Sequence, residues 1–331
     1  MIWPQAALWA SIWAALALAA AIVLLWTFGP RATMDSRLTF DAGGMGPDLD
    51  AYLADRETRF ADITPGVEKR ILWAGAAGAQ TDLAVVYIHG FSATSEEIRP
   101  VPDRVAKALG ANLFYTRLAG HGRGGAALAG ATTGAWIDDL AEALAIGQRI
   151  GRKVLVIATS TGATLAAVGA TDPRLSAQIQ GLVLVSPNFR LRNPAAGLLT
   201  LPFARRWVPL VAGRERAFTA RHPQQATYWT LRYPTAALFA MAALVAHALR
   251  QDFASAPQPA LFVYAPADRV VDQRQTARIA ARWGGPRQEA RRVMGPTDDP
   301  EAHVIAGDIL SPGQTADTAK LIVDWARAQA F

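Results

Sequence analysis

Short apolar runs alternate with amphipathic segments from about residue 68 to the end of the chain. Most runs are nearly continuous and end in glycine, serine or proline, the pattern of strands buried on both faces of a parallel sheet. The amphipathic segments predict helices that cover these faces. We therefore predict an α/β fold with a mostly parallel sheet and helices on both faces. The predicted strands lie within 69–75, 82–90, 111–122 (with its glycine-rich turn), 153–160, 181–187, 259–271 (with the loop that ends it) and 290–295, and the predicted helices are about 96–109, 135–151, 163–170, 272–283 and 316–328.

The amino end has a different pattern. Residues 1–30 contain no charged side chain, and their apolar run exceeds the roughly 20 residues needed to cross a bilayer. They predict an N-terminal transmembrane helix. A cleaved signal peptide is the alternative, although a basic n-region and a clear A-x-A site are both missing. Arg31 and Arg37 favour a cytoplasmic domain after the span, with a periplasmic or other extracytoplasmic domain as the alternative.

The remaining chain divides into two parts. Residues 31–66 form a mixed linker with a short amphipathic helix at 49–63, and residues 67–331 form the α/β domain. Within that domain, an insertion at about 188–255 separates two predicted strands and is far longer than a crossover needs. It carries nine arginines against two acidic side chains, a net charge of +7, whereas the whole chain carries +6.

The amino-acid composition limits which side chains are available for catalysis or metal binding. The 331 residues include no cysteine, which excludes disulfides, cysteine-ligated zinc and thiol nucleophiles. Histidine, carboxylate and hydroxyl side chains remain as candidate catalytic groups. The positive charge comes almost wholly from arginine, without a lysine-rich run, zinc-finger spacing or RNA-binding signature, so we expect no nucleic-acid partner.

One strand-to-helix junction carries a candidate nucleophile. In "ATSTGA", Ser160 has a small residue two positions before it, Ala158, and another two positions after it, Gly162. A nucleophile elbow needs small residues there because its strained turn crowds neighbouring backbone, although the usual first residue is glycine. The alternative is a serine that only caps the helix and has no catalytic role.

The apolar strand before "HGFSAT" suggests an oxyanion hole for this serine. Gly90 lets the chain turn closely, so the backbone N–H of Phe91 and that of Thr161 are candidates to bind the oxygen that becomes negative in a tetrahedral intermediate. His89 is expected to stabilise the turn by hydrogen bonding.

An acid and a base follow in the order that a serine triad of this kind requires. Asp268 follows a strand, and His303 lies in the loop after the last predicted strand. His303 would accept the serine proton while Asp268 orients the imidazole. Asp272 is a rival acid. The other acidic residues near the histidine, interpreted as charges that solvate the loop, are Asp298, Asp299 and Glu301.

Five motifs together resemble a known family: "IHGFSAT", "LAGHGR", "ATSTGA", "APADRVVD" and "EAHVIAGD". In order and spacing they resemble the serine-nucleophile α/β-hydrolases, especially the monoacylglycerol lipase, lysophospholipase and carboxylesterase branch, over roughly residues 68–328. The resemblance implies the α/β-hydrolase fold, with a helical cap inserted between strands 6 and 7 at about 188–255. It also implies a structural turn at His121 and ester hydrolysis that needs neither a metal nor an organic cofactor.

We therefore expect a membrane-tethered serine hydrolase that cleaves a small lipid-like ester, such as a monoacylglycerol or lysophospholipid, through an acyl-enzyme. The apolar cap segments 197–211 and 228–245 are interpreted either as an acyl-chain pocket or as packing of the cap on the core. The cap arginines are candidates to meet anionic lipid head groups. The alternatives are an acyltransferase with the same triad and a non-catalytic membrane scaffold with a hydrolase fold.

Overall fold

A computed structural model describes residues 3–331, and residues 1–2 of the predicted anchor lie outside the described residues. The strands of its central sheet are β1 (Arg70–Leu72), β2 (Thr81–Ile88), β3 (Asn112–Tyr115), β4 (Gly151–Thr159), β5 (Gly181–Val185), β8 (Ala260–Tyr264) and β9 (Arg287–Arg291). Their order across the sheet is β1-β3-β2-β4-β5-β8-β9. Only β1 runs antiparallel to its neighbour in this sheet. The predicted mostly parallel sheet is confirmed.

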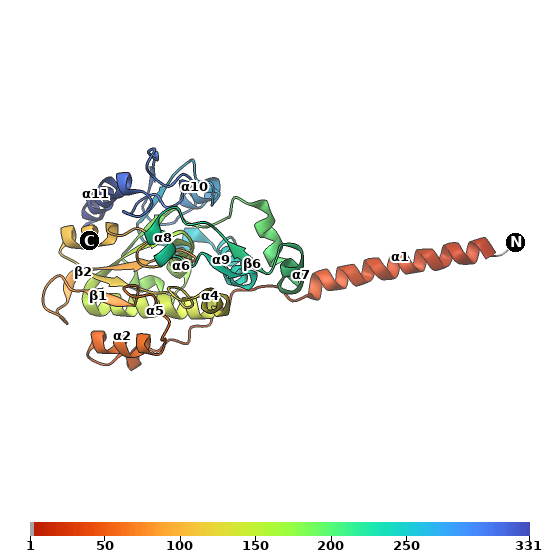
Figure 1. The fold of residues 1–331 in the computed structure, drawn as a ribbon, viewed down its shortest axis with the longest axis horizontal. Helices are drawn as coiled ribbons and strands as arrows, with labels where there is room; N and C mark the ends of the chain where they lie inside the picture. Colours follow the sequence, from red (N-terminus) through yellow and green to blue (C-terminus); the bar gives the residue numbers. More distant parts are fainter. Residues whose placement is uncertain (1–2) are drawn as a thin grey trace.

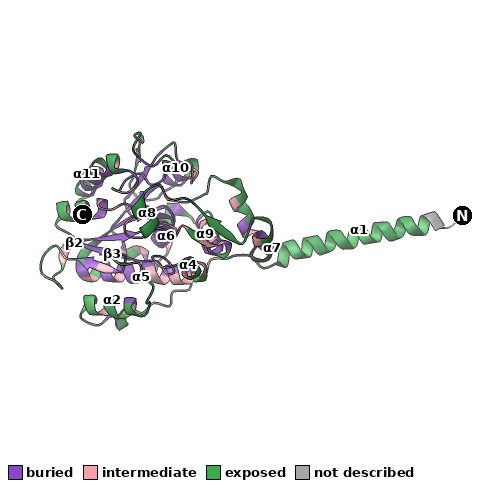
Figure 2. Ribbon diagram, in the orientation of Figure 1, coloured by how far each residue is buried: buried purple, intermediate pink, exposed green. Residues whose placement is uncertain are grey.

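Helices cover both faces of this sheet, as predicted (Figure 1). Their bounds are α2 (Leu49–Thr58), α3 (Val101–Leu109), α4 (Gly125–Gly130), α5 (Thr133–Ile150), α6 (Ser160–Thr171), α10 (Gln273–Ala281) and α11 (Pro312–Ala328). One core cluster joins the sheet to α2, α5, α6 and α10, and the other joins it to α3 and α11. The inner strands β2, β3, β4, β5 and β8 are largely buried between these layers, as Figure 2 shows for β2 and β3.

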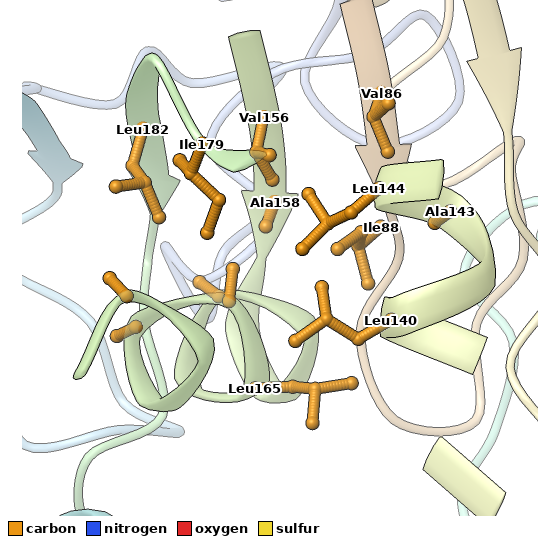
Figure 3. Close-up of a cluster of buried hydrophobic side chains, with 14 of the residues drawn as sticks. Val86, Ile88, Leu140, Ala143, Leu144, Val156, Ala158, Leu165, Ile179 and Leu182 are labelled. Carbon is orange, nitrogen blue, oxygen red and sulfur yellow. The ribbon is translucent and has the colours of Figure 1, made fainter. Parts of the chain in front are cut away.

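Strand β4 illustrates why its sequence reads as an unbroken apolar run. Val156 and Ala158 belong to the cluster drawn in Figure 3, where they lie close to Leu140 of α5. Leu155 and Ile157 belong to the cluster on the opposite face. Because successive side chains of a strand point to opposite faces, burial of both faces requires an apolar residue at every position.

The insertion between β5 and β8 forms a mixed cap. Its elements are η3 (Pro194–Thr200), α7 (Ala204–Val211), β6 (Glu215–Ala217), α8 (Pro223–Tyr228), β7 (Arg232–Pro234), η4 (Thr235–Ala237), α9 (Leu238–Ala248) and η5 (Phe253–Ser255). The antiparallel pair β6 and β7 adds a small sheet to the predicted helical cap; each strand has three residues, too few to give a periodic pattern. Five strands of the main sheet, β1 to β5, precede the cap in the described chain, so the cap follows the fifth strand and not the sixth.

Several predicted boundaries were wrong. The strand predicted from residue 111 ends at Tyr115, the strand predicted from residue 259 ends at Tyr264, and the last helix begins at Pro312 instead of residue 316. Helix α3 begins at Val101 and not at residue 96, because Pro100 precedes it and proline disfavours a helical residue before it. Strand β9 covers 287–291 in place of 290–295; it is an edge strand whose side chains are mostly exposed, so no apolar run marks it. Helix α2 ends at Thr58, short of the predicted residue 63.

The N-terminal helix α1 (Trp3–Phe28) projects away from the rest of the molecule (Figure 1). Its stretch from Gln5 to Phe28 has 24 residues and a mean hydropathy of 2.3, and none of its residues is buried. By length and composition it suits a membrane span, and a signal sequence has the same properties. Beyond its end, the carbonyl of Pro30 accepts a hydrogen bond of 2.8 Å from the N–H of Phe203, next to α7 of the cap.

The segment between α1 and β1 is bound to the core along its length. The N–H groups of Thr39 and Phe40 donate to the Asp138 carboxylate at 2.7 and 3.0 Å. At the end of the segment, the ammonium group of buried Lys69 donates to Asp139 at 2.8 Å and also pairs with Glu142 of α5. A buried cation that bridges two carboxylates therefore joins this segment to α5.

Replacing Lys69 with methionine should lower the free energy of unfolding by about 3–5 kcal/mol, because the buried carboxylates lose their shared cation. Urea denaturation of purified protein measures the change. Lys153 is the matched control, since it is exposed and its ammonium group contacts only a backbone carbonyl. Lys153→Met should change the stability by less than about 0.5 kcal/mol. Equal stabilities for the two variants would contradict the structural role of Lys69.

Candidate active site

Ser160 lies at the turn from β4 into α6. Its φ angle is 51°, in the left-handed region that non-glycine residues seldom occupy. The turn brings the chain against the end of β2, where a Cβ atom at Gly162 would lie 2.3 Å from the carbonyl oxygen of His89. Glycine is therefore required at position 162. Two residues before Ser160, the methyl group of Ala158 is fully buried in the core cluster that includes α5 and α6.

The structure brings Ser160 together with the predicted acid and base. The Oγ atom of Ser160 is 2.9 Å from Nε2 of His303, and Nδ1 of His303 is 2.9 Å from Oδ2 of Asp268. The other carboxylate oxygen of Asp268 accepts the N–H groups of Val270 and Val271 at 2.8 and 2.9 Å. These two backbone bonds fix the carboxylate, which then orients the imidazole with Nε2 free to accept the serine proton.

The charge of Asp268 controls the protonation of the buried histidine. Burial alone would lower the pKa of His303, because it disfavours the imidazolium. The carboxylate and hydrogen bond of Asp268 outweigh burial, helped by Glu97 and Asp299, and the pKa of His303 is raised above its ordinary value. A base with a raised pKa accepts a proton more readily but is neutral only at higher pH.

The rival acids have other roles in the structure. Asp272 caps helix α10 by accepting the N–H of Arg274. Asp298 and Asp299 are 5% and 6% exposed, so their interpretation as charges that solvate the loop was wrong. Each carboxylate accepts hydrogen bonds from backbone N–H groups: Asp298 from those of Gly295 and Gly313, and Asp299 from those of Glu301, His303 and Val304.

Both predicted oxyanion donors line the cavity above Ser160. Thr161 lies in the first turn of α6, where a helix leaves backbone N–H groups without an intrahelical acceptor. The N–H of Phe91 has no acceptor among the described hydrogen bonds. Nearby, His89 donates from Nδ1 to the Gly90 carbonyl at 2.9 Å and accepts the N–H of Leu118 at Nε2, which is the turn-stabilising role expected of it.

The cavity has a volume of about 680 Å³ and lies between the sheet end and the cap. Cap residues from the predicted segment 228–245 form much of its wall: Trp229, Tyr233, Leu238 and Met241. The other segment, 197–211, packs elsewhere, since Leu199 and Val208 belong to a separate cluster with Phe239. The interpretation as a pocket wall therefore fits segment 228–245, and the interpretation as packing fits segment 197–211.

Several functional contacts were not found from the sequence. Arg192 donates to the backbone carbonyl of Asp268 at 2.7 Å, and Arg221 pairs with Glu301 at 2.8 Å within the cavity wall. In the sequence these arginines were only part of the positive charge of the cap. A third missed residue is Glu97, a buried carboxylate of the cavity wall that the sequence placed in a helix.

The fold and the residues around Ser160 define the chain as an α/β-hydrolase of the serine class. Residues 79–295 match the model of the family described as serine aminopeptidase, S33, and the chain belongs to that family. No curated protein matches the sequence.

Solved structures with the same fold include lipases and esterases. A metagenome-derived lipolytic enzyme has a TM-score of 0.66 and 18% identity, covering 80% of this chain and 99% of that chain. The Saccharomyces cerevisiae monoglyceride lipase, as a soluble variant with a substrate analogue, has a TM-score of 0.56 and 12% identity, with coverages of 79% and 91%. The Paleococcus ferrophilus monoacylglycerol lipase has a TM-score of 0.54 and 14% identity, with coverages of 79% and 99%. At these low identities, the TM-scores and coverages establish a shared fold. This fold agrees with the lipase and esterase branch that the motifs resemble.

The raised pKa of His303 predicts the pH dependence of the reaction. Since the base must be neutral, the acid limb of kcat/KM should have its midpoint above the ordinary histidine value of about 6.5. Asp268→Asn removes the charge that raises this pKa, so the titration of His303 followed by NMR should move to lower pH. The same variant should lose about 10³–10⁴-fold in kcat. A midpoint at or below 6.5 in the parent enzyme, or an unchanged titration in the variant, would argue against this electrostatic coupling.

Proposed function

We propose that this protein is a serine hydrolase that cleaves carboxylic esters through an acyl-enzyme, with Ser160 as nucleophile, His303 as base and Asp268 as acid. The observation that carries the proposal is the pair of 2.9 Å contacts that link these side chains at the wall of a cavity. A serine that only capped a helix would need neither a buried imidazole at its oxygen nor a strained φ angle.

In the first half of the reaction, Oγ of Ser160 forms a bond to the ester carbonyl carbon while Nε2 of His303 takes its proton. The carbonyl oxygen becomes negative and accepts hydrogen bonds from the N–H groups of Phe91 and Thr161. The tetrahedral intermediate then expels the alcohol, which leaves with the proton from His303. An ester between Ser160 and the acyl group remains.

In the second half, a water molecule loses a proton to His303 and attacks the acyl-enzyme carbonyl. The same backbone donors stabilise the second tetrahedral intermediate. Collapse of this intermediate breaks the bond to Ser160 and returns the proton to its oxygen. The products are a carboxylic acid, an alcohol and the original enzyme, so the proposed cycle consumes only ester and water.

We assign the substrate to lipid-derived monoesters, such as a monoacylglycerol or lysophospholipid, because the cavity wall is mainly apolar. Trp229, Leu238 and Met241 would contact an acyl chain, and a volume of about 680 Å³ falls within the range of small-ligand pockets. Two of the structures with this fold are monoacylglycerol lipases.

Ser160→Ala should abolish labelling by a fluorophosphonate probe and hydrolysis of p-nitrophenyl esters, with the fold retained by circular dichroism. A panel of esters graded by acyl length should show the highest kcat/KM for chains long enough to fill the apolar wall, and aminoacyl amides in the same panel should react slowly. Product analysis with added glycerol separates hydrolysis from acyl transfer. Persistent labelling of the alanine variant would refute the nucleophile assignment.

We further propose that residues 1–30 are a retained membrane anchor and that the cap faces the lipid surface. Three features support this orientation: Phe203 at the start of α7 bonds to Pro30, Leu210 and Val211 of α7 are more than 70% exposed, and Arg205 and Arg206 lie on the same helix. Basic residues near a bilayer surface attract anionic head groups, by about 1 kcal/mol each.

Deleting residues 2–28 should move the protein from the membrane fraction to the soluble fraction, while esterase activity on a water-soluble substrate stays close to that of the parent. The full chain should resist extraction by alkaline carbonate, because α1 would lie across the bilayer. N-terminal sequencing of the purified full chain is the control. A mature protein that starts near residue 30 would show a cleaved signal peptide in place of an anchor.

A further inference from the structure

A buried carboxylate lies beside the candidate active site but takes no part in the proton transfers described above. Glu97 is 3% exposed and belongs to the wall of the cavity that contains Ser160 and His303. It lies in the loop between β2 and α3, the same loop that carries Phe91. A buried carboxylate is costly unless hydrogen bonds compensate it, so its partners indicate what it does.

The partners of Glu97 lie on the segment that leads to Phe91, and one of them also contacts the segment that leads to Thr161. Its Oε2 atom accepts the N–H of Gly90 at 2.6 Å and the hydroxyl of Tyr87 at 3.2 Å. The Tyr87 hydroxyl is also 3.1 Å from Oγ1 of Thr159, the residue before Ser160. A continuous set of buried hydrogen bonds therefore runs from the nucleophile turn through Tyr87 and Glu97 to the residue before Phe91.

The packing around Gly90 leaves this loop little freedom. A Cβ atom at Gly90 would lie 2.7 Å from Oε1 of Glu97 and 3.0 Å from Cβ of Ser160. The carboxylate, the loop backbone and the nucleophile are thus in direct contact. Because Glu97 binds the N–H on one side of Gly90, it restrains the orientation of the next peptide, whose N–H is that of Phe91.

We propose that Glu97 is a positioning residue, which holds the N–H of Phe91 in register with the N–H of Thr161 so that both meet the developing oxyanion. The proposal rests on the proposed serine-hydrolase function. In this role Glu97 touches neither the ester nor the transferred proton. Its contribution comes through the loop, where a displacement of about 1 Å is enough to reduce a rate by about 100-fold.

The charge of Glu97 gives the role a separate signature. Burial raises the pKa of Glu97 to about 7, against the hydrogen bond from Gly90 and the charge of His303, which lower it. The titratable groups that face Glu97 are Tyr87 from β2 and His303 from the loop after β9, while its neighbour Glu96 pairs with arginines. Since the carboxylate also contributes to the raised pKa of His303, removal of its charge should lower that pKa.

Three variants of the full chain test the proposal. Glu97→Ala removes the acceptor of the Gly90 N–H and should lower kcat by about 10- to 100-fold with KM changed by less than about 3-fold. Glu97→Gln keeps an oxygen acceptor and should restore kcat to within about 5-fold of the parent, while the acid limb of its pH profile moves to lower pH. Glu96→Ala is the matched control. Glu96 pairs with Arg70 and Arg99 outside the cavity wall, so this variant should match the parent in kcat and in the acid limb.

The outcomes separate this proposal from the proposed function. If the parent reacts neither with esters nor with a fluorophosphonate probe, the proposed function fails and this inference fails with it. If the parent is active and Glu97→Ala keeps a kcat within 2-fold of Glu96→Ala, the positioning role alone is overturned. A loss that glutamine does not restore would also overturn it. If Glu97→Ala does not fold, Glu97→Gln tests the proposal in its place. An unchanged acid limb in the pH profile of Glu97→Gln would then overturn the positioning role.

Discussion

The close approach of two parallel strand ends is the constraint on which the candidate site depends. In the sheet, β2 and β4 are neighbours, with Ile88 paired to Ala158. The chain turns sharply just beyond the end of each of these two strands. The absence of a side chain at Gly162 lets α6 start against the carbonyl of His89. This contact places one proposed oxyanion loop beside the nucleophile. The unusual φ of Ser160 is tolerated because the surrounding packed strands hold it.

Much of the fold was predictable because it follows from burial of the sheet. Strands β2, β4, β5 and β8 are covered on both faces, so each appears in the sequence as an uninterrupted apolar run. The three residues of the candidate triad were also identifiable, because each follows the carboxyl end of a strand and such ends gather at one edge of a parallel sheet. The order serine, acid, histidine agrees with Asp268 but is equally satisfied by Asp272, Asp298, Asp299 and Glu301, so it did not by itself select the acid.

The missed features depend on pairings that no local pattern contains. Nothing in "SEEI" distinguishes the buried Glu97 from the partly exposed Glu96, since the difference lies in partners from β2 and the loop that follows it. Asp299 was misinterpreted for a similar reason, because its hydrogen-bond donors are main-chain groups that carry no residue identity. Strand β9 is held by backbone pairing to β8 at the edge of the sheet, and its exposed polar side chains hide it.

The attachment of residues 31–69 to α5 affects how the molecule should be divided. Sequence similarity to the family begins at residue 79, yet the bonds from Thr39 and Phe40 to Asp138, and the buried cation of Lys69, lie before that point. Met45 and Leu53 belong to the same core cluster as α5 and α6. The cooperative unit is therefore larger than the part that is shared with relatives. A recombinant domain whose ends were chosen from the family match would expose a core face and leave Asp139 without its cation.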